Sequence, residues 1–180
     1  MATPPTFTTG AVLTAAQMNA VGMWITKVQT IGSGVSSQAV TDAFTADYAN
    51  YRILVSNVDL SSNGEALRLT LESVTGNVYK TNLQYASWGA VALANTGSSG
   101  TNTGFVLGFG GSTDNSNMVL DLHGPQLAKP TGMTGSSSSE TYFTISGGLC
   151  TSTVQSTGFT ITVDGGTMTG GTIRVYGYHN

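Results

Sequence analysis

Apolar and polar residues alternate along most of the chain after residue 22. In residues 66–72, leucines at positions 67, 69 and 71 alternate with Arg, Thr and Glu. Because successive side chains of a strand point to opposite faces, this pattern predicts a strand with one face in the core. The same alternation predicts strands at residues 51–58, 118–122, 159–163 and 172–178, with further candidates at 24–31, 35–43, 78–88, 105–109 and 140–145.

Clusters of Gly, Ser and Asn separate these segments, as turns separate the strands of all-β domains. About eight to ten strands are typical of an antiparallel β-sandwich, with jelly-roll topology as the leading option. We expect a turn at 95–100 and a flexible exposed loop at 131–139. Asp164 and Gly165 are expected to form a hairpin turn between two strands.

The first 22 residues have a different character. Residues 1–13 contain two prolines, four threonines and no periodicity, which predicts an extended arm. Residues 14–17 read as a capping box and Gly22 can end a helix, so we expect about two helical turns from residue 15 to residue 21. A helix this short needs a surface to pack on. We therefore divide the chain into an anchoring arm with a short helix, 1–22, and a β-sandwich domain, 23–180.

Charged residues are scarce. The chain has 6 Lys and Arg and 9 Asp and Glu among 180 residues, so 8% are charged, where about 25% is usual. No basic cluster is present to neutralise phosphates, so nucleic acid is not an expected partner. The N-terminus lacks a secretion signal, and no apolar run approaches the ~18 residues of a membrane span. We expect synthesis in the cytoplasm, no membrane partner, and self-association as a homotrimer through a neutral polar surface.

Titratable residues are too few to suggest a catalytic centre. His123 follows Asp121, which would allow a buried Asp–His pair, but a strand-end histidine bonded to the backbone is the favoured interpretation. No serine lies in a Gly-x-Ser-x-Gly turn. The single Cys150 has no disulfide partner and is expected to be a small buried residue. We expect no catalytic residue and no enzymatic activity.

Cofactor and metal sites are also not expected. Residues 114–117, and Asp42 with Asp47, carry oxygen ligands but lack the spacing of a calcium loop, so turns are favoured. The glycines of 108–111 are not followed by the helix that a nucleotide-binding loop requires. No Cys/His cluster has zinc spacing.

Aromatic residues offer an alternative function. Trp88, Tyr85 and Tyr79, with Tyr176 and Tyr178, would allow a platform that stacks on the sugar rings of a host-surface glycan. Alternating aromatic residues on strands are more often core or cross-strand pairs, which is the favoured interpretation here.

Three segments resemble small tail-fibre, head-fibre and decoration proteins of tailed bacteriophages: FTADYANYRILVSNV at 44–58, GGTIRVYGY at 170–178 and FTTGAVLTAAQMN at 7–19. The resemblance implies a β-sandwich head, often trimeric, that attaches to the virion through its N-terminal segment and has no enzymatic residues. Phe7, Val12, Leu13 and Met18 are the expected anchoring residues.

The chain lacks the long shaft of receptor-binding fibres between its arm and its sandwich. We therefore expect a virion structural protein, a short tail or head fibre whose partners are other phage structural proteins. A capsid decoration or cement protein and a carbohydrate-binding module remain as alternatives, and an enzyme is the weakest one.

Overall fold

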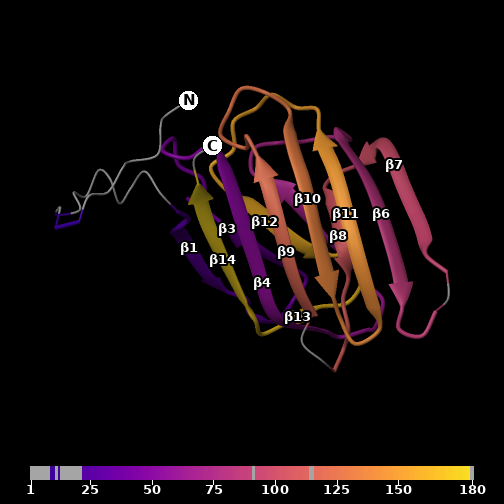
Figure 1. Ribbon diagram of the computed structural model, residues 1–180. Helices are drawn as coiled ribbons and strands as arrows, with labels where there is room; N and C mark the ends of the chain where they lie inside the picture. The colour runs from indigo at the N-terminus through magenta and orange to yellow at the C-terminus, as the bar shows by residue number, and fades with distance from the viewer. Residues whose placement is uncertain (1–8, 11, 13–21, 91, 114–115, 179–180) are drawn as a thin grey trace.

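The computed structural model describes residues 9–10, 12, 22–90, 92–113 and 116–178. These residues form two antiparallel β-sheets that pack face to face, with the larger sheet in front in Figure 1. They contain fourteen strands and no helix, and hence no helix that could span a membrane. The antiparallel β-sandwich predicted from the sequence is confirmed. The predicted helix at 15–21 lies outside the described residues.

The large sheet has ten strands. Eight of them follow one another across the sheet, and two short strands, β13 and β2, extend it beside β4. In order, the eight are β1 (Trp24–Thr30), β14 (Thr172–Tyr178), β4 (Asn50–Leu60), β9 (Ser116–His123), β10 (Thr131–Ser138), β11 (Tyr142–Cys150), β6 (Tyr79–Ser87) and β7 (Ala94–Asn102); β13 is Met168–Thr169 and β2 is Ser33–Val35.

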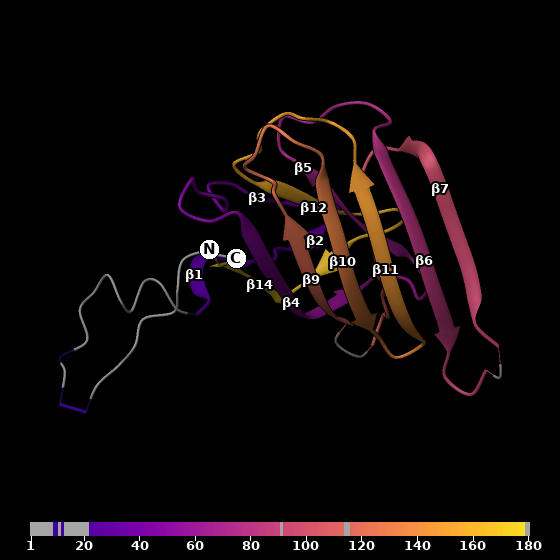
Figure 2. The same cartoon turned by 45° about the horizontal axis from the view of Figure 1, so that its top comes forward.

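The small sheet covers part of the inner face of the large sheet. Its order is β3 (Ser37–Val40), β12 (Phe159–Val163), β5 (Ala66–Leu71) and β8 (Phe105–Phe109). The chain enters and leaves the small sheet at each of its four strands: it crosses between β2 and β3, β3 and β4, β4 and β5, β5 and β6, β7 and β8, β8 and β9, β11 and β12, and β12 and β13 (Figure 2). These crossings place residues distant in sequence on opposite walls of the space between the sheets.

The core forms where the two inner faces meet. In β5, Leu67, Leu69 and Leu71 are buried, while the intervening side chains are partly exposed, as the alternation predicts. In β4, Tyr51 is fully buried, and its hydroxyl donates to the Thr45 carbonyl oxygen at 2.6 Å. The core cluster of the described residues draws on side chains from Ile31 to Val175, so the sandwich has one continuous core.

Cys150 behaves as its sequence context predicts. It is fully buried at the end of β11, opposite Tyr79 of β6. Burial raises the pKa of its thiol, because a thiolate would lose its hydration there. Apolar packing, without a disulfide, holds this part of the sheet together.

The expected loop at 131–139 is instead a central strand. β10 pairs with both β9 and β11 along its whole length. The sequence lacks apolar alternation because neighbouring groups approach closely: a Cβ added at Gly135 would lie 2.5 Å from Leu120 Cδ2 and 2.9 Å from the Val119 carbonyl oxygen. Small side chains here reflect a close approach rather than flexibility.

Two further expectations are wrong. Residues 95–100 form part of the edge strand β7 instead of a turn, because β6 supplies its backbone partners. Asp164 and Gly165 do not form a hairpin, because the strands that flank them belong to different sheets: β12 pairs with β3 and β5, whereas β13 pairs with β2 and β4.

Leu69→Ala tests this core directly. Leu69 is fully buried, so its truncation removes apolar contacts and leaves a cavity. We expect the free energy of unfolding, measured by urea denaturation, to fall by about 2–5 kcal/mol. The matched change Leu93→Ala, at a side chain 64% exposed, should alter it by no more than about 0.5 kcal/mol. Equal effects of the two changes would contradict the core assignment.

Candidate functional site

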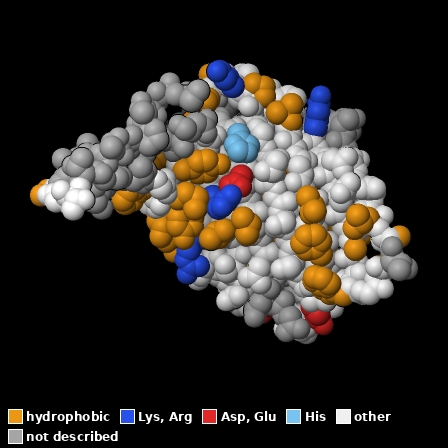
Figure 3. Space-filling model, viewed as in Figure 1, with side chains coloured by type: hydrophobic (Ala, Val, Ile, Leu, Met, Phe, Trp, Pro, Cys, Tyr) orange, Lys and Arg blue, Asp and Glu red, His pale blue; other side chains and the backbone are white. Residues whose placement is uncertain are grey.

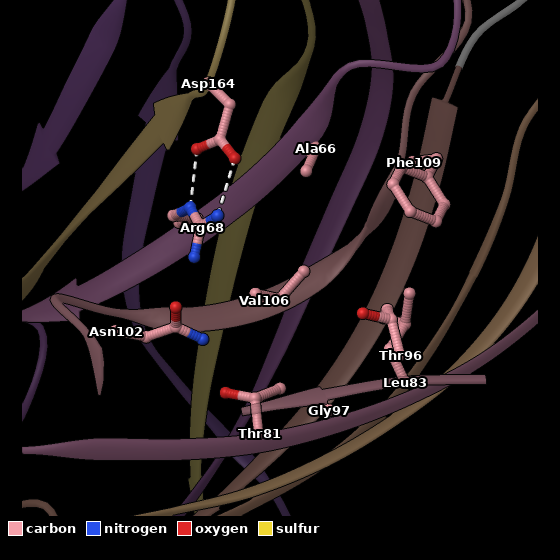
Figure 4. A pocket seen from close by; sticks show the side chains of 10 residues that line it. All are labelled: Ala66, Arg68, Thr81, Leu83, Thr96, Gly97, Asn102, Val106, Phe109 and Asp164. Carbon is pink, nitrogen blue, oxygen red and sulfur yellow. Dashed lines mark hydrogen bonds and ion pairs between the residues drawn. The ribbon is translucent and has the colours of Figure 1, made fainter. Parts of the chain in front are cut away.

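A cleft lies between the edge of the small sheet and the β6–β7 end of the large sheet. Its volume is about 260 Å³. Four strands and the segment after β12 contribute its walls (Figure 4). The lining residues are Ala66, Arg68, Thr81, Leu83, Thr96, Gly97, Asn102, Val106, Phe109 and Asp164.

An ion pair forms one wall of this cleft. The guanidinium of Arg68 donates to both carboxylate oxygens of Asp164, through Nε to Oδ1 at 2.5 Å and through Nη2 to Oδ2 at 2.7 Å. These hydrogen bonds raise the pKa of Arg68. The third guanidinium nitrogen points into the cleft (Figure 4). The pair therefore carries no net charge but keeps free donors and acceptor lone pairs at the cleft.

The floor of the cleft holds a hydroxyl without a partner. Thr81 is 5% exposed, and its Oγ1 has no hydrogen-bond partner among the described residues. Its side chain points up into the cleft from β6 (Figure 4). A buried hydroxyl that has lost water without gaining a protein partner carries a free-energy cost.

An apolar wall adjoins the ion pair. Val106 of β8 is the cross-strand partner of Arg68, and Phe109 of β8 and Leu83 of β6 extend the apolar lining. The Phe109 ring packs edge-on against Tyr85, with ring centroids 4.8 Å apart, and in a tilted arrangement against Tyr142, with ring centroids 5.3 Å apart. The cleft thus combines a fixed aromatic ring with hydrogen-bonding groups.

The outward face of the large sheet is a second candidate surface (Figure 3). Two groups of apolar side chains lie on it, separated by a polar strip over β10. One group lies over β1, β14, β4 and β9, and the other over β11. The first group comprises Ile25, Val28, Leu54, Val119 and Tyr176, and the second comprises Phe143, Ile145 and Leu149.

The Asp–His pair that the sequence allows, as the less favoured interpretation, is not formed. Asp121 accepts both hydrogen bonds of an Arg52 fork, at 2.9 and 2.7 Å, on the outward face of the large sheet. The Nδ1 atom of His123 lies 3.3 Å from Oδ1 of Asn50, a side chain rather than the favoured backbone group. The two titratable residues therefore have separate partners.

No metal-binding arrangement is present in the part of the chain that the structure describes. Within it, no three His, Cys, Asp or Glu side chains are grouped so that they could hold an ion. Residues 114–115 of the calcium candidate lie outside that part. The glycines of 108–111 belong to the end of β8 and the segment after it.

The aromatic platform that Trp88, Tyr85 and Tyr79 would form in the alternative interpretation does not assemble. Tyr79 is fully buried, with its hydroxyl accepting from the Leu71 backbone N–H at 2.9 Å, so its assignment as a glycan contact is wrong. Tyr85 is half-buried against Phe109. Trp88 is 60% exposed and donates from Nε1 to the Ser139 carbonyl oxygen at 2.8 Å.

Of the expected anchoring residues, one is described. Val12 is 88% exposed. Phe7, Leu13 and Met18 lie outside the described residues, and their role stays a prediction.

Sequence reasoning did not find the cleft. Arg68 and Asp164 are 96 positions apart, and each was assigned to a strand or a turn on local grounds. Their pairing depends on β5 and β12 being neighbours in the small sheet, which alternation alone does not reveal.

Comparisons of the chain with known protein families, with curated proteins and with solved structures find no match.

Trp88→Ala tests whether Trp88, which directly follows β6, belongs to the surface or to the core. Because the indole is mostly exposed and makes one hydrogen bond, we expect a loss of about 1 kcal/mol in the free energy of unfolding, measured by urea denaturation. A loss of about 3 kcal/mol or more would place Trp88 in the core instead.

Proposed function

We propose that the chain is a structural component of a tailed bacteriophage virion, a short fibre-like appendage of the tail or head. The observation that carries the proposal is the broad outward face of the large sheet, which presents apolar side chains and few charges (Figure 3). The resemblance of residues 7–19, 44–58 and 170–178 to phage fibre and decoration proteins points the same way.

The outward face suits contact with protein. Phe143, Ile145 and Leu149 are 39%, 53% and 40% exposed on β11. The strip beside them, over β10, consists of Gly132, Thr134, Ser136 and Ser138, whose short side chains allow another surface to approach closely. Contiguous exposed apolar patches on soluble proteins mark interaction surfaces.

Charge on this face is sparse. Arg52 and Asp121 neutralise each other there, and Arg174 lies on the same face as the register partner of Val28 and Leu54. One such cation per copy adds only a small, salt-screened repulsion between two faces. We propose that copies of the chain associate through this face as a homotrimer. The same face would also serve a capsid decoration or cement protein, the second candidate, by tying capsomers together.

The N-terminal segment 1–22 is the proposed anchor to the particle. Core residues of the described chain begin at Ile31, so the sandwich does not draw its core from the described residues of this segment. An arm of this kind would be ordered by a partner, at the cost of chain entropy when it binds.

Light scattering tests the association. We expect a particle of three times the chain mass of 18.5 kDa at micromolar concentration, because the outward face buries apolar area between copies. Ile145→Lys should shift the protein to monomer, since it places a charge in that contact. Val154→Lys, an equally exposed valine in the β11–β12 connection, is the control and should remain trimeric. A monomer in the unaltered protein would contradict the proposal.

Deletion of residues 1–22 tests the anchor. The truncated chain should fold with a melting temperature within about 2 °C of the full chain, because the core formed by the described residues begins at Ile31. It should fail to co-sediment with purified virions when it complements a virus that lacks the protein. Equal incorporation of both forms would show that the segment is not the anchor, and failure to fold would place it in the core.

A further inference from the structure

We propose that the cleft between β5, β8 and the β6–β7 hairpin binds one ring of a neutral saccharide. This inference rests on the cleft alone and is independent of the proposed virion role. The groups that line the cleft define the chemistry of the ligand.

Charge balance selects a neutral ligand. Among the described residues that line the cleft, Arg68 is the one cation, and Asp164 neutralises it through two hydrogen bonds. An anion would have to compete with the carboxylate for the guanidinium. A metal ion would find a single carboxylate, which is already engaged.

Hydroxyl groups match the polar wall. The carboxylate of Asp164 retains lone pairs that accept from one hydroxyl, and the remaining N–H groups of Arg68 donate to another. Adjacent hydroxyls on a pyranose ring can each donate and accept, so one can donate to the carboxylate while its neighbour accepts from the guanidinium. The Asn102 amide, which lies beside Arg68 in the cleft, offers a further N–H donor and a further carbonyl acceptor (Figure 4).

Thr81 gives an independent indication. Its buried Oγ1 has no partner within the described chain, although most buried hydroxyls in proteins have one. A ligand hydroxyl seated in the cleft would satisfy it. The unpartnered Thr81 hydroxyl at the floor is a separate observation from the ion pair in the wall of the cleft.

The apolar wall and the volume fit the ring itself. Contacts with Tyr85 and Tyr142 already restrict the Phe109 side chain. This side chain therefore loses little conformational freedom when the C–H face of a sugar packs on its phenyl ring. The volume of about 260 Å³ lies below the roughly 300 Å³ at which drug-sized sites begin. It therefore suits a single ring rather than an extended chain in the cleft.

Saturation-transfer NMR on the full chain tests the proposal. The probes are D-glucose, D-galactose, D-mannose and N-acetyl-D-glucosamine, each added singly, with inorganic phosphate as the anionic probe. We expect at least one sugar to receive saturation and to shift the backbone amides of Arg68, Thr81 and Asn102, and phosphate to have no effect.

Two variants locate the binding. Asp164→Asn keeps the side-chain shape but removes the charged acceptor, so the Kd of the sugar should rise tenfold or more. Asp121→Asn is the matched control, because it alters a similar Arg–carboxylate fork on the outward face, and it should leave the Kd unchanged. Thr96→Trp provides a second test in case Asp164→Asn fails to fold. The substitution lies at an exposed position on the cleft rim, and the indole should abolish sugar binding by filling the cleft.

The outcomes divide cleanly. Saturation of none of the four sugars would overturn the proposal, as would preferential binding of phosphate. Equal weakening by Asp164→Asn and Asp121→Asn, or full binding by Thr96→Trp, would place any sugar elsewhere on the molecule.

Discussion

The close packing of β8 against the inner face of the large sheet is the contact on which the rest of the structure depends. β8 lies against β6, β10 and β11, and Phe105 packs edge-on against Tyr79 with ring centroids 4.9 Å apart. The approach leaves no space for a side chain at Gly108, where a Cβ would lie 2.0 Å from Ser137 Oγ. The distance between the sheets at this edge is therefore set by glycine and serine rather than by large apolar residues.

This packing also forms the cleft. With β8 seated on the large sheet, its outward side chains Val106 and Phe109 face the β6–β7 end of that sheet. β5, held between β12 and β8, brings Arg68 within reach of Asp164. The proposed saccharide site is thus a consequence of how the sheets are stacked.

Strands with alternating leucine, isoleucine or valine could be predicted from the sequence. β5 and β4 are the clearest cases, because one face of each is buried and the other is not. β7 and β10 could not be predicted in this way, since all but one residue of each, Ala94 and Met133, are Gly, Ser, Thr or Asn, and both strands owe their structure to neighbouring strands. Tertiary context outweighs local propensity in such strands.

The candidate sites were less predictable than the fold. Tyr79 carries a hydroxyl, as surface aromatic residues often do, but its side chain faces the core. It lies on the inner face of β6, opposite the buried Cys150. The Arg68–Asp164 pair and the unpartnered Thr81 depend on the arrangement of strands from both sheets. Alternation assigns a side chain to one of two faces, and only the stacking of the sheets decides which residues then meet.

The virion role is the central functional proposal, and quantitative mass spectrometry of gradient-purified phage particles from a host that produces the chain tests it most directly. The account predicts that the protein is present in the particles at a fixed ratio to the major capsid protein, in multiples of three copies per attachment site. A protein found only in the soluble fraction of the lysate, and absent from purified particles, would contradict it.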